Sequence, residues 1–189
     1  PENRLTELPS LVLPQLKYLS LTKNEYQKLP GTVASLKSLL GLNISNNYLQ
    51  EIKSGALPPA LETIDASGNG ISIFPIAIGE TLTLTKIDLS GNALSLLPEL
   101  GQLTNLTSLN LSNNQLTSLT NLSSMTSLKF LNLSKNRFDT IDACFDLRDL
   151  ESLDLSHNNL NALPQSGWKN FGSLKALSLN ANRIYILPK

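Results

Sequence analysis

Leu106-Thr-Ser-Leu109-Asn-Leu111-Ser-Asn-Asn114-Gln-Leu116-Thr-Ser-Leu119 is the stretch that decides the fold, because its spacing of leucine and asparagine recurs along the chain. A regular period of 20 to 29 residues is typical of a solenoid, in which each copy packs only against its neighbours. The sequence therefore predicts eight full copies, preceded by the second half of another. Their aligned asparagines lie 21 to 24 residues apart, at Asn3, Asn24, Asn47, Asn69, Asn92, Asn114, Asn136, Asn158 and Asn182.

Apolar and polar residues alternate over the first part of each copy, L-x-x-L-x-L. This period of two predicts a short strand with one buried face. Successive strands run in the same direction, so we expect eight of them to form one parallel sheet, from near Tyr18 to near Ser178, on the inner face of an arc.

The asparagine of each copy comes where the strand ends and the backbone turns. Its side-chain amide offers donors and an acceptor to main-chain groups that no strand partner satisfies. We expect stacked copies to form a ladder of these side chains, made of Asn24, Asn47, Asn69, Asn92, Asn114, Asn136, Asn158 and Asn182.

The segments that return the chain to the next strand are short and contain proline. Proline fixes φ and lacks an N–H, which suits irregular segments better than long helices. We expect turns, extended pieces and short 3₁₀ segments, with a helical turn within residues 165–171. The third copy departs from the pattern, because Ala66 occupies a buried strand position and Leu57-Pro58-Pro59 comes before it.

The full pattern, L-x-x-L-x-L-x-x-N-x-L-x-x-L, resembles the leucine-rich repeat family over essentially all 189 residues. The resemblance implies an α/β fold: a right-handed solenoid bent into a horseshoe arc, with a parallel sheet on the concave face and mostly irregular or 3₁₀ returns on the convex face. It also implies a binding role, with no chemistry in the repeats. No linker or charge run interrupts the period, so we expect residues 1–189 to be a single domain, a fragment of a longer chain.

The charge balance argues against a nucleic-acid partner. Lysine and arginine number 15, as do aspartate and glutamate, so the net charge is zero and no excess of cations is available for phosphates. No apolar run approaches 18 residues, so we expect no membrane insertion. The single cysteine forms no internal disulfide, and neither end resembles the cysteine-rich caps of many extracellular members of the family. We therefore expect a cytoplasmic location, although five N-x-S/T sequons keep an extracellular one open.

Candidate chemistry is sparse. The one histidine, His157, and the one cysteine, Cys144, fall in different parts of their copies, and no ligand spacing for a metal is present. Asp65 and Asp88 occupy equivalent positions in adjacent copies, where paired carboxylates could do acid–base work, but Asp or Asn at this position is a habit of the repeat. We expect no enzyme activity, no cofactor and no metal.

Two columns of strand residues face the concave side: Tyr18, Gly41, Thr63, Lys86, Ser108, Phe130, Ser152 and Ala176, and then Ser20, Asn43, Asp65, Asp88, Asn110, Asn132, Asp154 and Ser178. Positive and negative zones alternate along them, and two residues are aromatic. Such mixed polarity favours a protein partner. We expect contacts at Tyr18, Asp65, Lys86, Asp88, Phe130, Lys135, Asp154 and His157.

The sequence therefore favours a protein–protein interaction module, an adaptor or scaffold that binds through its concave face. Two alternatives stay open. One is a regulatory repeat segment of a multidomain enzyme such as a kinase, phosphatase, cyclase, GTPase or ubiquitin ligase. The other is the ectodomain of an extracellular receptor. Neither the partner nor the oligomeric state follows from the residues.

Overall fold

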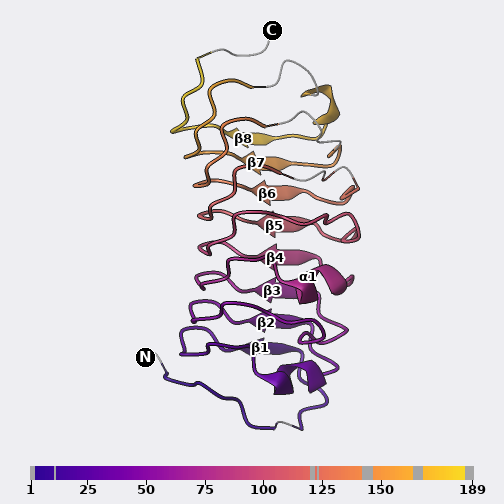
Figure 1. Cartoon of the computed structure of the whole chain (residues 1–189). Coiled ribbons are helices and arrows are strands. Elements are labelled where there is room, and N and C mark those ends of the chain that lie inside the picture. The colour runs from indigo at the N-terminus through magenta and orange to yellow at the C-terminus, as the bar shows by residue number, and fades with distance from the viewer. Residues whose placement is uncertain are drawn as a thin grey trace.

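The structure is a computed structural model that describes residues 3–10, 12–119, 122, 124–141, 147–163 and 168–185. The chain winds as a stack of turns, and each turn contributes one short strand to a single column (Figure 1). Neighbouring strands pair in parallel and in chain order. The eight strands are β1 (Tyr18–Ser20), β2 (Gly41–Asn43), β3 (Thr63–Asp65), β4 (Lys86–Asp88), β5 (Ser108–Asn110), β6 (Phe130–Asn132), β7 (Ser152–Asp154) and β8 (Ala176–Ser178).

The register of the sheet follows the repeat without slippage. Tyr18 lies opposite Gly41 at one end, and Ser152 lies opposite Ala176 at the other. The first and third residues of each strand face the concave side, and the middle residue faces the core. Both columns read from the sequence are therefore confirmed, as is the parallel sheet of eight strands.

The core between the sheet and the returns is almost entirely aliphatic. The middle strand residues Ile64, Ile87 and Leu109 are at most 2% exposed. Ala66, the small residue of the third copy, is fully buried at its strand position. The core thins at the ends of the stack, where Leu177 of β8 is 41% exposed because β8 pairs with β7 alone in the described chain.

The returns contain three short helical segments, and no helix of the described chain is long and apolar enough to cross a membrane. They are η1 (Gly31–Ser35), α1 (Ile76–Glu80) and η2 (Trp168–Asn170). The last lies inside the segment predicted to hold a helical turn. The α-helical turn α1 differs from the 3₁₀ segments expected there. Pro75 begins it, Ala77 and Ile78 are buried beneath it, and the Thr81 hydroxyl donates to the Ala77 carbonyl at 2.7 Å.

Each asparagine of the ladder joins its own turn to the one before. The Asn114 amide nitrogen donates to the carbonyl oxygens of Leu89 and Leu111, both at 3.0 Å, and its side-chain oxygen accepts from the Leu94 N–H at 3.0 Å. The same pattern repeats from Asn47 to Asn182. No buried side-chain nitrogen or oxygen of the described residues lacks a hydrogen-bond partner. The ladder thus satisfies main-chain groups that the turn leaves unpaired.

The residue before each of these asparagines has a left-handed backbone, which the leucine pattern does not predict. Its φ lies between 52° and 64° in all eight turns. This conformation costs a residue with a Cβ atom about 1–2 kcal/mol, so glycine, which has none, adopts it most easily. In the first seven turns the N–H of this residue donates to a carbonyl of the next turn, as from Asn113 to Ser134 at 2.9 Å, which helps to offset the cost. The positions are Lys23, Asn46, Gly68, Gly91, Asn113, Lys135, His157 and Ala181.

Candidate recognition surface on the concave face

A shallow hollow of about 620 Å³ lies on the concave face over strands β1 to β5, and we name it the concave hollow. It brings together four of the eight residues expected to make contacts. Its lining is Tyr18, Leu19, Ser20, Gly41, Leu42, Asn43, Thr63, Ile64, Asp65, Lys86, Ile87, Asp88, Ser108 and Asn110.

The Tyr18 ring lies against Gly41 on the neighbouring strand. A Cβ atom placed on Gly41 would come within 2.7 Å of Tyr18 Cδ1 and 2.9 Å of Thr63 Oγ1, closer than real Cβ contacts allow. Tyr18 is nevertheless 73% exposed, and its hydroxyl makes no hydrogen bond to a described residue. The glycine thus makes room for an aromatic ring that presents its surface to the hollow.

The two carboxylates of the hollow are held by the backbone that follows them. Asp65 Oδ1 accepts from the N–H and hydroxyl of Ser67, at 3.0 and 2.6 Å. Asp88 Oδ1 accepts from Ser90 in the same way, and its Oδ2 accepts from the Asn110 amide at 2.9 Å. Asp65 Oδ2 has no such partner among the described residues. Asp65 therefore keeps one oxygen for a ligand, whereas Asp88 uses both inside the protein.

This turn explains why the repeat carries Asp or Asn at the third strand position. Asn43, Asn132 and Asp154 each accept a hydrogen bond from the N–H two residues later, at 2.9 to 3.0 Å. Either side chain can do this, because both have a carbonyl or carboxylate oxygen at the same place. The pair Asp65 and Asp88 thus has a role in the backbone that needs no acid–base chemistry.

Lys86 supplies the positive charge of the hollow. It is exposed at the start of β4 and makes no ion pair with a described residue. Its neighbours in the register are Thr63 and Ser108, both uncharged. The groups available to a ligand are therefore the Tyr18 ring and hydroxyl, the Lys86 ammonium and one oxygen of Asp65.

The other four expected residues lie outside the concave hollow. Phe130 is 49% exposed on β6, about 24 Å from β1 at ~4.8 Å per strand. Asp154 belongs to β7. Lys135 and His157 are exposed in the left-handed turns at the ends of the strands, beside the sheet. A ligand must extend along the arc to reach them.

An ion-pair cluster lies just before the last three strands. The Lys175 ammonium is 2.8 Å from Glu151 Oε2, and the Lys129 ammonium is 3.6 Å from Glu151 Oε1. The hydrogen bond from Lys175 and the two positive charges hold the pKa of Glu151 below its usual value. The cluster ties neighbouring turns to one another at the surface.

No catalytic arrangement emerges from the described residues. No group of three His, Cys, Asp or Glu side chains among them could hold a metal ion. Cys144 lies outside the described residues, so the expected absence of a Cys–His pair stays a prediction.

Burial raises the pKa of Tyr26. The Tyr26 hydroxyl donates a hydrogen bond to the Glu7 carbonyl at 3.2 Å, and this contact stabilises the first turns.

Reading the sequence alone missed Gly41 as part of the site. The available signal was a glycine in a concave column where most copies carry a larger residue. A strand glycine often marks a place where another group approaches closely. Here that group is the Tyr18 ring.

Comparison with known proteins places the chain among repeat proteins. It is 33% identical over 111 residues to the Ras guanine nucleotide exchange factor V of Dictyostelium discoideum, a match that covers 51% of this chain and 6% of that protein. A leucine-rich repeat protein of Leptospira interrogans has a similar structure, with a TM-score of 0.80 and 30% identity, covering 99% of this chain and 55% of that one. The TLR13–ssRNA13 complex gives a TM-score of 0.84 at 26% identity, covering 92% of this chain and 26% of that one.

The family assignment rests on the whole stack. Leucine-rich repeat family profiles match residues 14–71, 82–124, 127–147 and 149–171. These ranges contain seven of the eight strands, and β8 follows them in the same sheet and register. The chain belongs to the leucine-rich repeat family.

Proposed function

We propose that the chain is a protein-recognition module whose concave hollow binds a protein partner. The observation that carries the proposal is the exposed Tyr18 ring, which lies against Gly41 in a hollow of about 620 Å³ that Lys86 also lines. Aromatic residues flanked by polar groups are common anchors of protein interfaces. Protein binding is also the general role of the family's fold.

The charges of the hollow favour protein over nucleic acid. Lys86 is the one cation among its lining residues, and two carboxylates accompany it. Binding a phosphate backbone depends on several cations that displace counterions, which this surface does not offer. The structurally similar TLR13 was solved in complex with ssRNA13, so RNA is one of the outcomes that the capture experiment distinguishes.

The length of the sheet suits an extended partner. Eight strands at ~4.8 Å give an inner edge of about 34 Å, and a typical partner buries about 800 Å² of each surface. A protein anchored on Tyr18 at one end could reach Phe130 further along the arc. We propose that these two aromatic residues are separate contact points of the same partner.

A second candidate is a regulatory repeat segment in a longer multidomain protein. It is favoured by the match to the Dictyostelium exchange factor, of which the aligned part is only 6%. The two candidates use the same concave hollow and differ in what flanks the repeats. We also propose the cytoplasmic location that the sequence analysis expects.

The experiment is affinity capture from a native extract, followed by mass spectrometry and by sequencing of any bound RNA. The test variant carries Tyr18→Ala with Lys86→Glu. The control carries Tyr48→Ala with Lys169→Glu, which changes a tyrosine of similar exposure, 63%, and a lysine, both away from the concave hollow.

The proposal predicts that wild type and control capture the same protein and that the test variant does not. Capture that survives in the test variant would contradict it. Capture that depends on RNA and disappears after nuclease treatment would show that the ligand class is wrong.

A further inference from the structure

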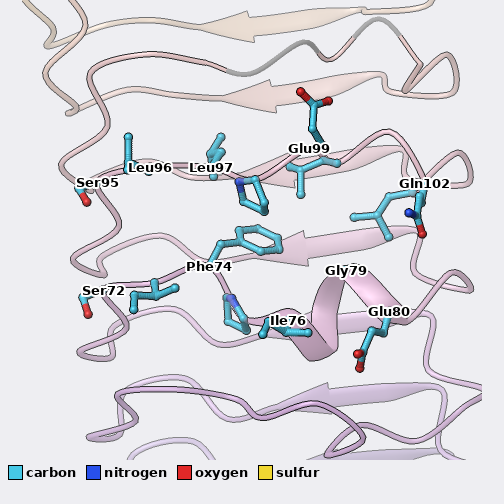
Figure 2. Close-up of a pocket in the computed structure, with 15 residues that line it drawn as sticks. Ser72, Phe74, Ile76, Gly79, Glu80, Ser95, Leu96, Leu97, Glu99 and Gln102 are labelled. Atoms are coloured by element: carbon cyan, nitrogen blue, oxygen red, sulfur yellow. The ribbon is translucent and has the colours of Figure 1, made fainter.

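A second hollow lies on the opposite side of the fold, between two successive returns, and we name it the return hollow. It has a volume of about 600 Å³, and Figure 2 shows it between the return that contains α1 and the next one. Its lining is Ser72, Ile73, Phe74, Pro75, Ile76, Gly79, Glu80, Ser95, Leu96, Leu97, Pro98, Glu99, Leu100, Gln102 and Leu103.

The floor of this hollow is part of the core, but its walls are exposed apolar side chains. Phe74 is 5% exposed and lies between the two returns in Figure 2. Three other lining residues, Ile73, Ile76 and Leu96, are 77%, 65% and 67% exposed. Large apolar side chains gathered at one exposed place mark interaction sites on many proteins.

The equivalent positions of the other copies show whether the fold itself requires these apolar side chains. Four residues after the ladder asparagine, the third and fourth copies carry Ile73 and Leu96. At the same place the first, second, fifth, sixth and seventh copies carry Lys28, Glu51, Ser118, Thr140 and Ala162, and Ile186 of the last copy lies outside the described residues.

The position seven residues after the ladder asparagine gives the same contrast. The first, second and fourth copies carry Gly31, Ser54 and Glu99 there, whereas the third carries Ile76. Because those copies build their turns without a large apolar residue, the fold does not require the three side chains. Their gathering around one hollow in two adjacent copies needs another explanation.

The charges at the rim indicate the chemistry of the occupant. Among the lining residues the ionisable side chains are Glu80 and Glu99, and both carboxylates lie at the surface. Glu80 is fixed in place by the Ser54 hydroxyl, which donates to its carboxylate at 2.8 Å. Glu99 makes no ion pair with a described residue. Figure 2 shows the two glutamates on opposite sides of the hollow with their carboxylates directed away from Phe74, so a ligand that extends past the rim on each side can reach a negative charge.

We propose that the return hollow docks a short peptide segment of a protein partner, with a large apolar side chain at its centre and lysine or arginine on both sides. The apolar side chain lies over Phe74 between Ile73, Ile76 and Leu96. The flanking cations lie near Glu80 and Glu99. The volume falls in the range of pockets that enclose a small ligand or a few side chains. This site is separate from the concave hollow and does not depend on it.

The test uses three labelled hexapeptides with blocked ends. The first has a Leu-Phe centre with two lysines on each side, the second has glutamates in place of the lysines, and the third has two serines in place of the apolar centre. Fluorescence anisotropy gives the Kd of each. Methyl NMR spectra locate binding through the signals of Ile73, Ile76 and Leu96.

The first peptide is expected to bind and to shift these methyl signals, and the other two to bind at least tenfold more weakly. Ile73→Ser with Leu96→Ser, which copies the serine found at Ser118, is expected to keep the circular dichroism spectrum and the thermal midpoint while weakening the first peptide at least tenfold. Glu80→Gln with Glu99→Gln is expected to weaken it several-fold. Tyr18→Ala is expected to leave it unchanged, which separates this site from the concave hollow.

Absence of binding by the first peptide would overturn the proposal. Equal binding of the lysine and glutamate peptides, or binding that the double serine variant retains, would overturn it as well. Binding to phosphatidylcholine vesicles that requires Ile73 and Leu96, without peptide binding, would show that the occupant is lipid and that the peptide proposal is wrong.

Discussion

The Tyr18 ring lies over Gly41 so closely that a Cβ atom on the glycine would come within 2.7 Å of the ring. The two residues are register partners on β1 and β2, so the contact follows from the pairing of the first two copies. This contact holds the Tyr18 ring along the concave face, and the ring forms one wall of the concave hollow.

Gly41→Ala tests the functional importance of this contact. The added methyl group displaces an exposed ring, which can rotate into solvent, so the fold is expected to tolerate it. The free energy of unfolding is expected to change by less than about 1 kcal/mol, since alanine also restricts the unfolded chain more than glycine does. Capture of the concave partner is expected to fall, and unchanged capture would mean that the position of the ring is unimportant.

Asn114→Leu tests the asparagine ladder. The substitution keeps a similar volume but leaves the N–H of Leu94 without its partner, and the carbonyls of Leu89 and Leu111 each lose one of their two asparagine donors. We expect a loss of about 1–3 kcal/mol in urea unfolding. Thr117→Ala, an exposed change in the same copy, is expected to be nearly neutral. If the two variants unfold at the same urea concentration, the ladder does not stabilise the turns.

A pair of glycines tests the left-handed turns. Gly91 has a φ of 64°, and nothing lies closer than 3.4 Å to a Cβ placed on it, so Gly91→Ala adds backbone strain with little steric conflict. We expect a loss of about 1 kcal/mol. Gly79→Ala in α1, where a Cβ meets nothing within 4 Å, is expected to gain about 0.5 kcal/mol because alanine is the better helix former. Thermal unfolding that shifts in the same direction for both would contradict this interpretation.

Glu151 predicts a pH-dependent contribution from the cluster with Lys129 and Lys175. Its pKa is lowered in the folded state, so the cluster stabilises the protein at pH values above the ordinary carboxylate pKa and the effect disappears as the pH falls through the folded value. Wild type is therefore expected to be more stable than Glu151→Gln at pH 7, and the difference is expected to shrink towards zero in acid. Urea unfolding of both proteins from pH 7 to pH 3 measures it. A difference that grows in acid would have the wrong sign.

The sequence predicted those features that repeat. The strands, both concave columns and the hydrogen bonds of Asn114 and its equivalents follow from one phrase stacked on itself, so any regular copy suffices to derive them. Most features that differ between copies were not predicted, although η2 falls within residues 165–171, where a helical turn was expected. The turn α1 depends on Pro75 and on the burial of Ile78. The position of the Tyr18 ring depends on Gly41 in the next copy. Tyr18 and Gly41 are 23 positions apart, and both their contact and the burial of Ile78 become visible only when the turns are stacked.

The candidate site was predicted in part for the same reason. Tyr18, Asp65, Lys86 and Asp88 share one hollow because their strands are neighbours, whereas Phe130 lies beyond β5. The concave columns predicted which residues form the surface but not that a hollow lies over β1 to β5. The return hollow was missed entirely, because Ile73 and Leu96 look like ordinary apolar residues until the equivalent positions of the other copies are compared.

The most direct test of the central claim is the Kd of the captured concave partner for three proteins: wild type, Tyr18→Ala and Tyr48→Ala. The two variants remove tyrosines of similar exposure, 73% and 63%. Tyr18 lies on the concave face, and Tyr48 lies in the turn after β2. Truncating an interface anchor costs about 2 kcal/mol, which corresponds to about a 30-fold weaker Kd. We predict that loss for Tyr18→Ala and no change for Tyr48→Ala. Equal affinities of wild type and Tyr18→Ala, or a loss confined to Tyr48→Ala, would contradict recognition through the concave hollow.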